Sequence, residues 1–319
     1  FIWGPITLIL ILGTGIFLSL GLKGFTFTYI LVAFKQIFRK DEKATDGEIT
    51  SFQSLTTALS ATVGTGNIAG VATAIYIGGP GAVFWMWVSA LFGMATKYAE
   101  AFLAIKYREK NANGETVGGP MYYIKNGLSK NYIVFAYLFA LAGMIAALGI
   151  GNGVQVNSVS QVIESEFGIS AFTVGIFIAV LVALVILGGI KSIGKITSKL
   201  VPLMSAIYIL GGLWIIVLNY TEVTYVFNLI TTSAFTSTAA TGGFAGATVW
   251  MALRYGVARG VFSNEAGLGS SPIAHAAANT NNPAKQGMIS MLEPLIDTLI
   301  VCTITAFVIL MSNLWIGEI

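Results

Sequence analysis

SATVGTGNIAG, residues 60–70, stands at the centre of an apolar run, Ser54 to Ile77, that carries no charged side chain. The run is long enough to cross a membrane, because a helical span needs about 20 residues. Its centre nevertheless holds three glycines, and each glycine weakens a helix by about 1 kcal/mol relative to alanine. The stretch therefore predicts a membrane helix that is broken at mid-depth.

The composition of the chain is that of a protein embedded in lipid. Of its 319 residues, 55% are hydrophobic and 10% are charged, and the mean hydropathy is +0.81. A soluble domain carries about 25% charged residues. The apolar runs are long and continuous, as in residues 169–189, rather than short and alternating as in a membrane barrel. We therefore expect an all-α polytopic membrane protein, with the lipid bilayer as a partner.

Residues that would support catalysis, cofactor binding or nucleic-acid binding are scarce. The single cysteine, Cys302, has apolar neighbours and is expected to serve packing. The single histidine, His275, stands in no Cys/His cluster, which argues against zinc or haem. The glycines of residues 64–70 miss the GxGxxG spacing and follow no strand. The net charge of +3 comes without a basic patch, so we expect no enzyme, no cofactor and no nucleic-acid partner.

Long apolar runs predict eight membrane segments, and basic residues predict their orientation. The segments are 1–22, 54–78, 81–105, 131–163, 170–189, 199–219, 247–279 and 287–312. Lysine or arginine follows the first, third, fifth and seventh segments, whereas the intervening connections hold Glu164, Glu166 and Glu222 without a basic residue. Since basic loops remain in the cytoplasm, the N-terminus is expected outside. The short apolar stretch 24–38, which contains Lys35, is predicted to be an interfacial amphipathic helix.

The seventh segment repeats the irregularity of the second. RGVFSNEAGLGSSP, residues 259–272, places glycines beside serine and asparagine, and adds a carboxylate, Glu265, and Pro272, which cannot continue a helix hydrogen-bond ladder. One such segment would be explained by close helix packing. Two of them, five segments apart, cross the membrane in opposite directions. This arrangement favours an inverted repeat, in which interrupted spans mark the binding site.

A break at mid-depth also predicts the kind of molecule that binds there. The break frees N–H groups on one half-helix and C=O groups on the other, and lipid can satisfy neither. The positive end of a half-helix suits a carboxylate, and free carbonyls suit a cation. A zwitterion with a companion cation fits both ends. A channel would instead require a continuous polar pore or a carbonyl filter, and the sequence contains no run typical of either.

Several long motifs resemble one transporter family. They are TALSATVGTGNIAGVATA at 57–74, GGPGAVFWMWVSALFGMATKYAEAFLAIKYR at 78–108, GGPMYYI at 118–124, ILGGIKSIGK at 186–195 and RGVFSNEAGLGSSPIAHAAA at 259–278. With these motifs the sequence resembles the alanine or glycine:cation symporter family of bacteria and archaea over nearly its whole length. The run GPGAVFWMW followed by GMATKYAE is highly specific.

The resemblance implies a leucine-transporter-like fold of the amino acid–polyamine–organocation superfamily. That fold has two inverted five-helix repeats, and the first helix of each repeat is broken. Residues 1–319 would then form a single transporter domain, with 1–22 as an extra leading helix, 54–219 as the first repeat and 247–312 as the first two helices of the second. The last core helices are absent from this sequence, so we expect the chain to be incomplete.

The resemblance also implies a binding site. In TVGTGN, the N–H groups of Thr65 and Gly66 would hold a substrate carboxylate. Carbonyl and side-chain oxygens of Thr62 and Asn67 would hold sodium, and the carbonyls of Ser60 and Val63 would belong to a second sodium site. The substrate contacts implied are Thr65, Gly66, Asn67, Gln155, Phe262, Ser263 and Asn264, and the sodium ligands are Thr62, Asn67, Ser60, Val63 and Asp297. Gln155 and Asp297 also stand out by themselves, because polar groups at membrane depth are costly and usually face a cavity or a partner. Two roles remain open for Asp297, that of a cation ligand and that of a gate partner.

Two further charged groups are expected to form ion pairs. Glu265, in the seventh segment, is expected to pair with Arg259 or Arg254. Lys97 and Glu100 are three residues apart in the third segment, and are expected to pair near the cytoplasmic interface.

The resemblance implies a secondary active symporter in the cell membrane of a bacterium or archaeon. It would couple an inward cation gradient, expected to be sodium, to the uptake of alanine or glycine by alternating access. Sodium would be a co-transported ion rather than a cofactor. The membrane carboxylates Glu265 and Asp297 leave a proton-coupled carrier of small amino acids open as the alternative.

Overall fold

The computed structural model describes residues 4–39, 47–236, 249–312 and 315. The predicted segment positions 1–3, 247 and 248, together with Lys40 and Lys43 of the first basic loop, lie outside the described residues. Apart from one two-stranded hairpin, the regular structure of the described residues is helical. The expected helical class is therefore confirmed.

Helices follow one another along the chain. In order they are α1 (Pro5–Gly21), α2 (Phe25–Thr28), α3 (Ile30–Ile37), α4 (Ser51–Thr62), η1 (Gly66–Gly70), α5 (Val71–Gly78), α6 (Gly81–Lys106), α7 (Pro120–Gly127), η2 (Lys130–Tyr132), α8 (Ile133–Ala146), η3 (Ala147–Gly153), α9 (Val154–Phe167), α10 (Ala171–Ile186), α11 (Gly189–Leu218), η4 (Tyr220–Glu222), α12 (Val223–Ser233), α13 (Val249–Asn264), α14 (Ser271–Ala276), α15 (Pro283–Ser290), α16 (Leu292–Pro294), η5 (Leu295–Cys302) and α17 (Thr303–Met311). The hairpin pairs β1 (Glu109–Lys110) with β2 (Thr116–Val117) in antiparallel register.

Several of these helices can span a membrane. Within the described residues, four stretches are long and apolar enough, namely α6, residues 130–167, α11 and residues 283–311, and the bent pair α4 and η1–α5 makes a fifth. Helices α1 and α10 are apolar but shorter. These helices are those of a multi-pass membrane protein.

One predicted boundary is wrong, because α11 begins at Gly189 rather than at residue 199. The prediction began this segment only at Lys199, the last of three lysines. The helix runs through Lys191, Lys195 and Lys199, since a lysine can lie on a helix end and extend its ammonium group to water.

The first predicted break is present. Helix α4 begins with a capping box, in which the Thr50 hydroxyl accepts from the N–H of Gln53 at 3.1 Å and the Gln53 side chain accepts from the N–H of Thr50 at 2.9 Å. The helix ends at Thr62, and the chain resumes at Gly66 with a bend of 53°. Between them, Val63 is extended, with ψ of 104°. The N–H groups of Gly64 and Thr65 leave the helical ladder and donate to the side chains of Asn67 and Gln155 instead.

The second predicted break is present as well. Helix α13 ends at Asn264, α14 begins at Ser271, and residues 265–270 between them are not helical. Glu265 has a φ of 55°, and Gly267 and Gly269 have φ of 88° and 80°. Glycine adopts this left-handed region without steric cost, so the two glycines allow the chain to leave and re-enter a helix within six residues.

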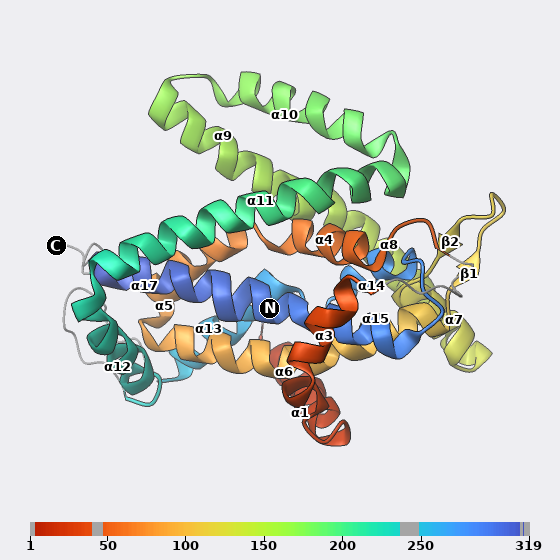
Figure 1. Cartoon of the computed structure of the whole chain (residues 1–319), viewed down its shortest axis with the longest axis horizontal. Coiled ribbons are helices and arrows are strands. Elements are labelled where there is room, and N and C mark those ends of the chain that lie inside the picture. The colour runs from red at the N-terminus through yellow and green to blue at the C-terminus, as the bar shows by residue number, and fades with distance from the viewer. Residues whose placement is uncertain (1–3, 40–46, 237–248, 313–314, 316–319) are drawn as a thin grey trace.

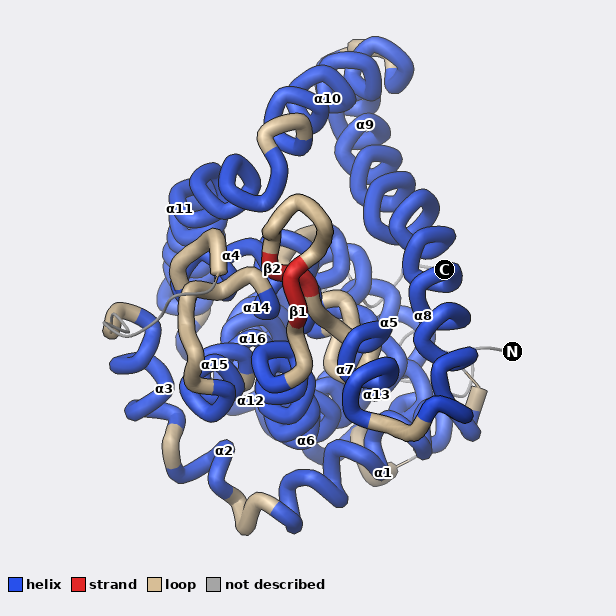
Figure 2. Tube along the Cα trace, turned by 90° about the vertical axis from the view of Figure 1, so that its right-hand side faces the viewer, coloured by secondary structure: helices blue, strands red, loops and turns tan. Residues whose placement is uncertain are grey.

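Helix α6 runs through the middle of the helical bundle (Figure 1) and packs against α1, α13, α14 and α15. Its close approach to α13 depends on two glycines of α13. A Cβ atom on Gly256 would overlap the carbonyl oxygen of Ala82, and one on Gly260 would lie 3.2 Å from Cα of Met86. Helices α9 and α10 arch away from this bundle and rejoin it through α8 and α11 (Figures 1 and 2).

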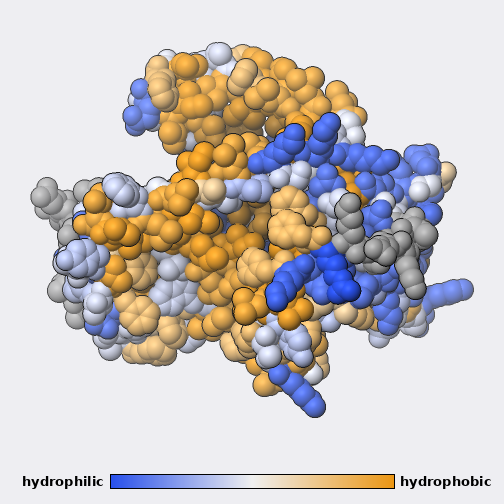
Figure 3. Space-filling view, in the orientation of Figure 1, coloured by the Kyte–Doolittle hydropathy of each residue, from blue (hydrophilic) through white to orange (hydrophobic). Residues whose placement is uncertain are grey.

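The surface of the molecule is divided by polarity. Figure 3 shows hydrophilic residues gathered at the end that carries β1, β2 and α7, and hydrophobic surface over α9, α10 and α11. On that apolar surface, Leu187 is 85% exposed and Phe172 is 78% exposed. Side chains this apolar are exposed at low cost when their solvent is lipid.

Two apolar clusters lie along α6 and leave the breaks between them. One includes Met86 of α6 with Val71 of α5, and the other includes Met94 of α6 with Leu55 of α4. Eight residues of helix correspond to about 12 Å. The polar groups of the two breaks therefore lie between two packed layers rather than at either end of the molecule.

Candidate functional site

Asn67 lies where the two broken segments meet. The residue belongs to η1 and is 1% exposed. Its Oδ1 accepts a hydrogen bond of 2.7 Å from the N–H of Gly64, which closes the turn of its own break. Its Nδ2 donates to Oγ of Ser263, in the last turn of α13, at 3.1 Å. The two breaks predicted from sequence are therefore in direct contact.

A third element, the π-helix η5, reaches the same point. Asp297 of η5 is fully buried, and its Oδ1 accepts from Nδ2 of Asn67 at 2.6 Å. Its Oδ2 accepts from the hydroxyl of Thr298 at 2.7 Å, and that hydroxyl accepts from Nδ2 of Asn264 at 3.1 Å. A buried carboxylate is thus joined to both breaks by hydrogen bonds. A π-helical stretch within a longer helix often occurs at a functional site.

The junction of Asn67, Ser263 and Asp297 has the chemistry of a cation site. Helices α4 and α13 both end there, and the carboxyl end of a helix carries a partial negative charge with unpaired carbonyls. Amide, hydroxyl and carboxylate oxygens suit hard cations. In the described part of the chain, no group of three or more His, Cys, Asp or Glu side chains is placed to hold a metal ion. A cation at the junction would therefore rely on amide, hydroxyl and backbone oxygens besides Asp297.

Gln155 of α9 contacts the first break. Its Oε1 accepts from the hydroxyl of Thr65 at 2.8 Å and from the N–H of Thr65 at 3.2 Å. Gly64 permits this approach, because a Cβ atom there would lie 3.1 Å from the same oxygen. The side-chain oxygen of Gln155 thus occupies one of the N–H groups that were predicted to hold a carboxylate, and a carboxylate oxygen accepts hydrogen bonds in the same way.

Gly66 and Phe262 flank the junction. A Cβ atom on Gly66 would lie 3.5 Å from Cα of Ser263, so the backbones of the two breaks approach closely at this point. Phe262 is half-buried, and the guanidinium carbon of Arg259 lies 5.7 Å from the centre of its ring. Both residues are next to positions of the junction in sequence and in space.

The structure does not bring three of the predicted sodium ligands to the junction through their side chains. The hydroxyl of Thr62 is buried and donates to the carbonyl of Leu59 at 3.3 Å. Ser60 is exposed and donates to the carbonyl of Thr57 at 2.7 Å. Val63 packs on an apolar cluster beside Leu59. A role for these residues in ion binding stays a prediction.

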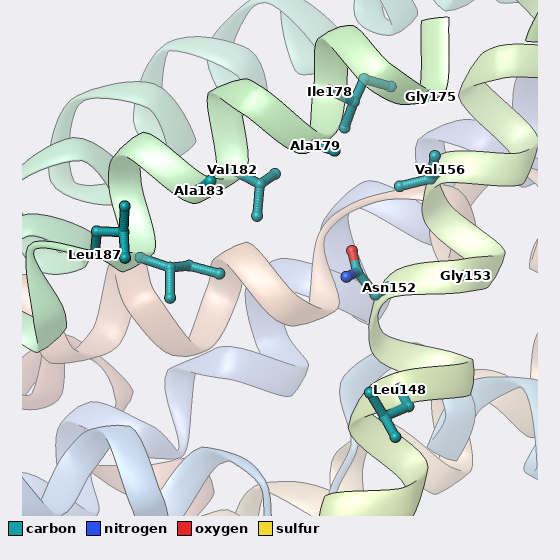
Figure 4. A pocket seen from close by; sticks show the side chains of 11 residues that line it. Leu148, Asn152, Gly153, Val156, Gly175, Ile178, Ala179, Val182, Ala183 and Leu187 are labelled. Atoms are coloured by element: carbon teal, nitrogen blue, oxygen red, sulfur yellow. The ribbon is translucent and has the colours of Figure 1, made fainter. Parts of the chain in front are cut away.

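A pocket that the structure shows lies elsewhere. A pocket of about 550 Å³ lies between η3–α9 and α10, and its lining is apolar except for Asn152. Figure 4 shows the amide of Asn152 pointing from its helix into the space that Val182 and Ala183 border. A zwitterion carries two charges, and a pocket with a single amide offers no charged group to pair with either. This pocket is therefore not the predicted site.

A second buried polar cluster surrounds Glu293 of α16. Its carboxylate lies 2.9 Å from Nζ of Lys97 and 2.6 Å from Nε2 of His275. It also accepts from the hydroxyls of Ser271, at 2.8 and 2.9 Å, and Ser290, at 2.7 Å. Lysine, histidine and glutamate are all fully buried. The cluster ties the second half of the broken seventh segment to α6 and to the last span.

The Glu293 cluster overturns the expected pairing of Lys97. Lys97 was expected to pair with Glu100 near an interface, but its ion pair is with Glu293 and its side chain is fully buried. Sequence spacing brings Lys97 and Glu100 to neighbouring positions of one helix, whereas packing of α16 on α6 brings a second carboxylate to the ammonium group. Gln286 extends the cluster, donating to Oγ of Ser54 in α4 at 2.8 Å.

The expected ion pair of Glu265 with arginine is wrong too. Within the described residues, the hydrogen bond to the Glu265 carboxylate comes from the hydroxyl of Ser270. Arg254 and Arg259 instead lie over the rings of Tyr255 and Phe262. The left-handed backbone of Glu265 turns its side chain along the break loop rather than back along α13.

Sequence reasoning missed Glu293, and it assigned Cys302 to packing alone. The sulfur of Cys302 is buried and lies 3.3 Å from Nδ2 of Asn67 and 3.4 Å from Oγ of Ser263. A signal for Glu293 was present, because it precedes Asp297 by four residues in an apolar run and such positions share one face of a helix.

The chain is similar to known transporters over its whole length. A sequence-family profile described as "Sodium:alanine symporter family" matches residues 1–318. The chain is 52% identical over 317 residues to the sodium/alanine symporter AgcS of Methanococcus maripaludis, covering 98% of this chain and 69% of that protein. It is 49% identical over 319 residues to the uncharacterized transporter YflA of Bacillus subtilis, covering 99% and 67%. It is 43% identical over 314 residues to the putative sodium/proton-dependent alanine carrier protein YrbD of Bacillus subtilis, covering 98% and 63%.

Proposed function

The chain belongs to the sodium:alanine symporter family, and from this premise we propose that it carries alanine or glycine into the cell together with sodium. Family and relatives indicate transport of the sodium/alanine symporter type rather than enzyme chemistry. The observation that carries the finer proposal is the hydrogen bond from Asn67 to Asp297. Through this bond, the two breaks and the last span meet at one buried junction.

The junction supports the proposal through its polarity. Oxygens of Ser263 and Asp297 lie near the carboxyl ends of α4 and α13, where a sodium ion would be stabilised, and Nδ2 of Asn67 donates to both. The N–H group of Thr65 donates to Oε1 of Gln155, where it would donate to a substrate carboxylate. An amino acid would place its carboxylate at Thr65 and Gly66 and its side chain toward Phe262. A small side chain suits the close approach of Gly66 to Ser263.

Coupling follows from shared contacts. If sodium and the amino acid bind the same arrangement of the two breaks more tightly than any other, each raises the affinity for the other by the same factor. Transport then requires that the broken segments move against the rest of the protein, so that the junction opens first to one side and then to the other.

The wider architecture belongs to the same proposal. We place the chain in the leucine-transporter-like fold, with residues 54–219 as one repeat and 247–312 as the beginning of an inverted second one. Two broken segments of opposite direction in contact with each other support this placement. The proposal includes an N-terminus on the outside, which the basic connections support, and a location in the cell membrane of a bacterium or archaeon.

The alternative is a carrier of the same fold that is driven by protons. The observation that favours it is Asp297, a fully buried carboxylate with hydrogen bonds from two neutral donors, Asn67 and Thr298. A relative's name, sodium/proton-dependent alanine carrier, points the same way.

Uptake by the full-length transporter in liposomes separates the two. Labelled alanine is followed under an inward sodium gradient at equal pH, and under an inward proton gradient without sodium. We expect uptake with sodium alone, competition by unlabelled glycine, and collapse when an ionophore removes the sodium gradient. Uptake driven by the proton gradient alone would replace sodium with the alternative, and no uptake under either gradient would refute the proposed substrates.

A further inference from the structure

Glu100 of α6 is a buried carboxylate that the proposed coupling does not use. It lies in a stretch long and apolar enough to span a membrane, and it is 8% exposed. Its Oε2 is buried and has no hydrogen-bond partner among the described residues.

The break loop, residues 265–270, lies against α6 close to Glu100. A Cβ atom on Gly267 would lie 3.7 Å from Cγ2 of Thr96, and one on Gly93 would lie 3.0 Å from Cβ of Ala266. Glu265, Gly267 and Gly269 all have left-handed φ, at 55°, 88° and 80°. The loop therefore covers this part of α6 in an irregular conformation that differs from a helix.

The cationic groups near Glu100 already have a carboxylate partner. The ammonium group of Lys97, one turn earlier on α6, lies 2.9 Å from Glu293, and the imidazole of His275 on α14 lies 2.6 Å from Glu293. Lys97, Glu293 and Tyr123 of α7 lie near enough to Glu100 to interact with it electrostatically. The lysine nearest to Glu100 is therefore already paired with another buried carboxylate.

Other charged groups on elements packed against α6 are engaged elsewhere. Glu265 of the break loop accepts a hydrogen bond from Ser270. The remaining ones are Asp297 of η5, Arg254 and Arg259 of α13, Lys285 of α15 and Lys125 of α7, and each has a partner other than Glu100. An ionised Glu100 would add an uncompensated negative charge to a buried site. Buried groups in this position become neutral instead, because an unpaired charge costs far more than an unpaired hydroxyl.

We propose that Glu100 is a proton-binding site, which holds a proton on Oε2 while the break loop packs against it and releases that proton when the loop moves away. Gly267, Leu268 and Ser270 of the loop are exposed, so movement of the loop brings water to Glu100. The O–H bond of the carboxyl group breaks, water takes the proton, and the carboxylate that remains is solvated. No other reactant is required.

The proton site would control the hinge of the seventh segment. The break loop joins α13, which carries Ser263 of the junction, to α14, which carries Ser271 and His275 of the Glu293 cluster. A neutral Glu100 is compatible with the closed loop, and an ionised one favours the open loop. This coupling rests on the proposed transport function, whereas the protonation of Glu100 does not.

Infrared difference spectroscopy of the full chain in lipid tests the protonation directly. A buried carboxylic acid has a C=O stretch that is separate from the carboxylate bands. At neutral pH we expect this band in the wild type, its loss in Glu100→Gln, and a shifted band in Glu100→Asp. The matched control is Glu109→Gln, since Glu109 is on the surface and a hydrogen bond from Lys125 lowers the pKa of Glu109, which keeps it ionised. The control should leave the band unchanged.

A wild-type spectrum without the band, or a Glu100→Gln spectrum that loses none of the carboxylic acid intensity, would overturn the proposal. If Glu100→Gln fails to fold, Glu100→Asp decides by whether the band shifts. In liposomes, Glu100→Gln should remove the pH dependence of alanine uptake that Glu100→Asp retains, and an unaltered pH profile in Glu100→Gln would refute the control of the hinge. Absence of alanine uptake by the wild type at every pH would refute the proposed function, and the infrared bands would still decide the proton site.

Discussion

The amide nitrogen of Asn67 lies 2.6 Å from Oδ1 of Asp297, although 230 residues separate the two in the chain. The same nitrogen lies 3.2 Å from the backbone carbonyl of Asp297 and 3.1 Å from the hydroxyl of Ser263. One side chain thus holds the first break, the second break and the last span together. A change in any of the three must alter the contacts of the other two, which is the physical requirement for coupled binding.

Asn67→Ala should disable this junction. The substitution leaves the buried Asp297 carboxylate without one of its donors, and an unsatisfied buried partner costs about 1–3 kcal/mol, or more when it is charged. We expect a lower melting temperature in detergent and a fall in sodium-driven alanine uptake of roughly tenfold or more, since about 1.4 kcal/mol corresponds to a factor of ten. Asn152→Ala, which removes an exposed amide from a membrane helix, is the control. Equal uptake by both variants would contradict the role of Asn67.

Gln155→Glu should weaken substrate binding more than sodium binding. The new carboxylate would stand at the N–H and hydroxyl of Thr65, where Gln155 now accepts hydrogen bonds of 3.2 and 2.8 Å. Like charges at close range in a site of low dielectric repel strongly. The KM for alanine should therefore rise by roughly tenfold or more, on the scale of about 1.4 kcal/mol per factor of ten.

Gln161→Glu makes the same chemical change one and a half turns further along α9, at an exposed position. It should leave the KM for alanine unchanged. If both variants raise the KM equally, the effect comes from charge on the helix and not from the contact with Thr65.

Lys97 and Glu293 should show strong coupling in a double-mutant cycle. Removing one partner of a buried ion pair costs about 3–5 kcal/mol, because the other charge is left uncompensated. Lys97→Met alone and Glu293→Gln alone should each lower the melting temperature sharply, and the double variant should be more stable than the sum of the two predicts.

The exposed pair Lys125 and Glu109, at 2.7 Å, provides the comparison. The matching variants Lys125→Met and Glu109→Gln should lower stability little and show almost no coupling, because solvent screens an exposed pair. Additive melting-temperature shifts for the buried pair would mean that its two charges do not stabilise each other.

Gly256→Ala should prevent α13 from packing on α6. The added methyl group would overlap the carbonyl oxygen of Ala82 and lie 2.6 Å from Cβ of Trp85. Neither of those atoms can move without displacing α6, so we expect loss of monodisperse protein in size-exclusion chromatography. Gly143→Ala in α8 meets no atom within 4 Å and should be neutral or stabilising, by up to about 1 kcal/mol from helix propensity. A normal yield of the Gly256→Ala variant would show that α13 and α6 pack less closely than the structure places them.

Arg108→Lys should loosen the chain after α14. The guanidinium group donates to the carbonyls of Ala276, Ala278 and Thr280 at 2.9, 2.8 and 2.8 Å. An ammonium group cannot reproduce this fork of donors. Amide hydrogen exchange of residues 276–281 should therefore become faster, while exchange in α6 stays slow. Unchanged exchange in this segment would show that other contacts hold it.

Some of the site could be predicted from the sequence because it is local. Glycines beside Ser, Thr and Asn in an apolar run weaken a helix wherever the run is placed, and both breaks lie where that composition predicts them, after Thr62 and after Asn264. Ion pairs were predicted less well. For Lys97 and Glu265, neighbouring charges in sequence were taken as partners, and in the structure the partners are Glu293 and Ser270.

The class of the protein and the places where its membrane helices are interrupted can be read from the sequence alone, because hydropathy and helix propensity are properties of short segments. Which polar groups meet depends on the packing of the helices. Asn67 and Asp297 are 230 residues apart and Lys97 and Glu293 are 196 apart. Their contact depends on how α6, α13, α16 and η5 pack, and a buried polar group takes whichever partner that packing brings within hydrogen-bond distance.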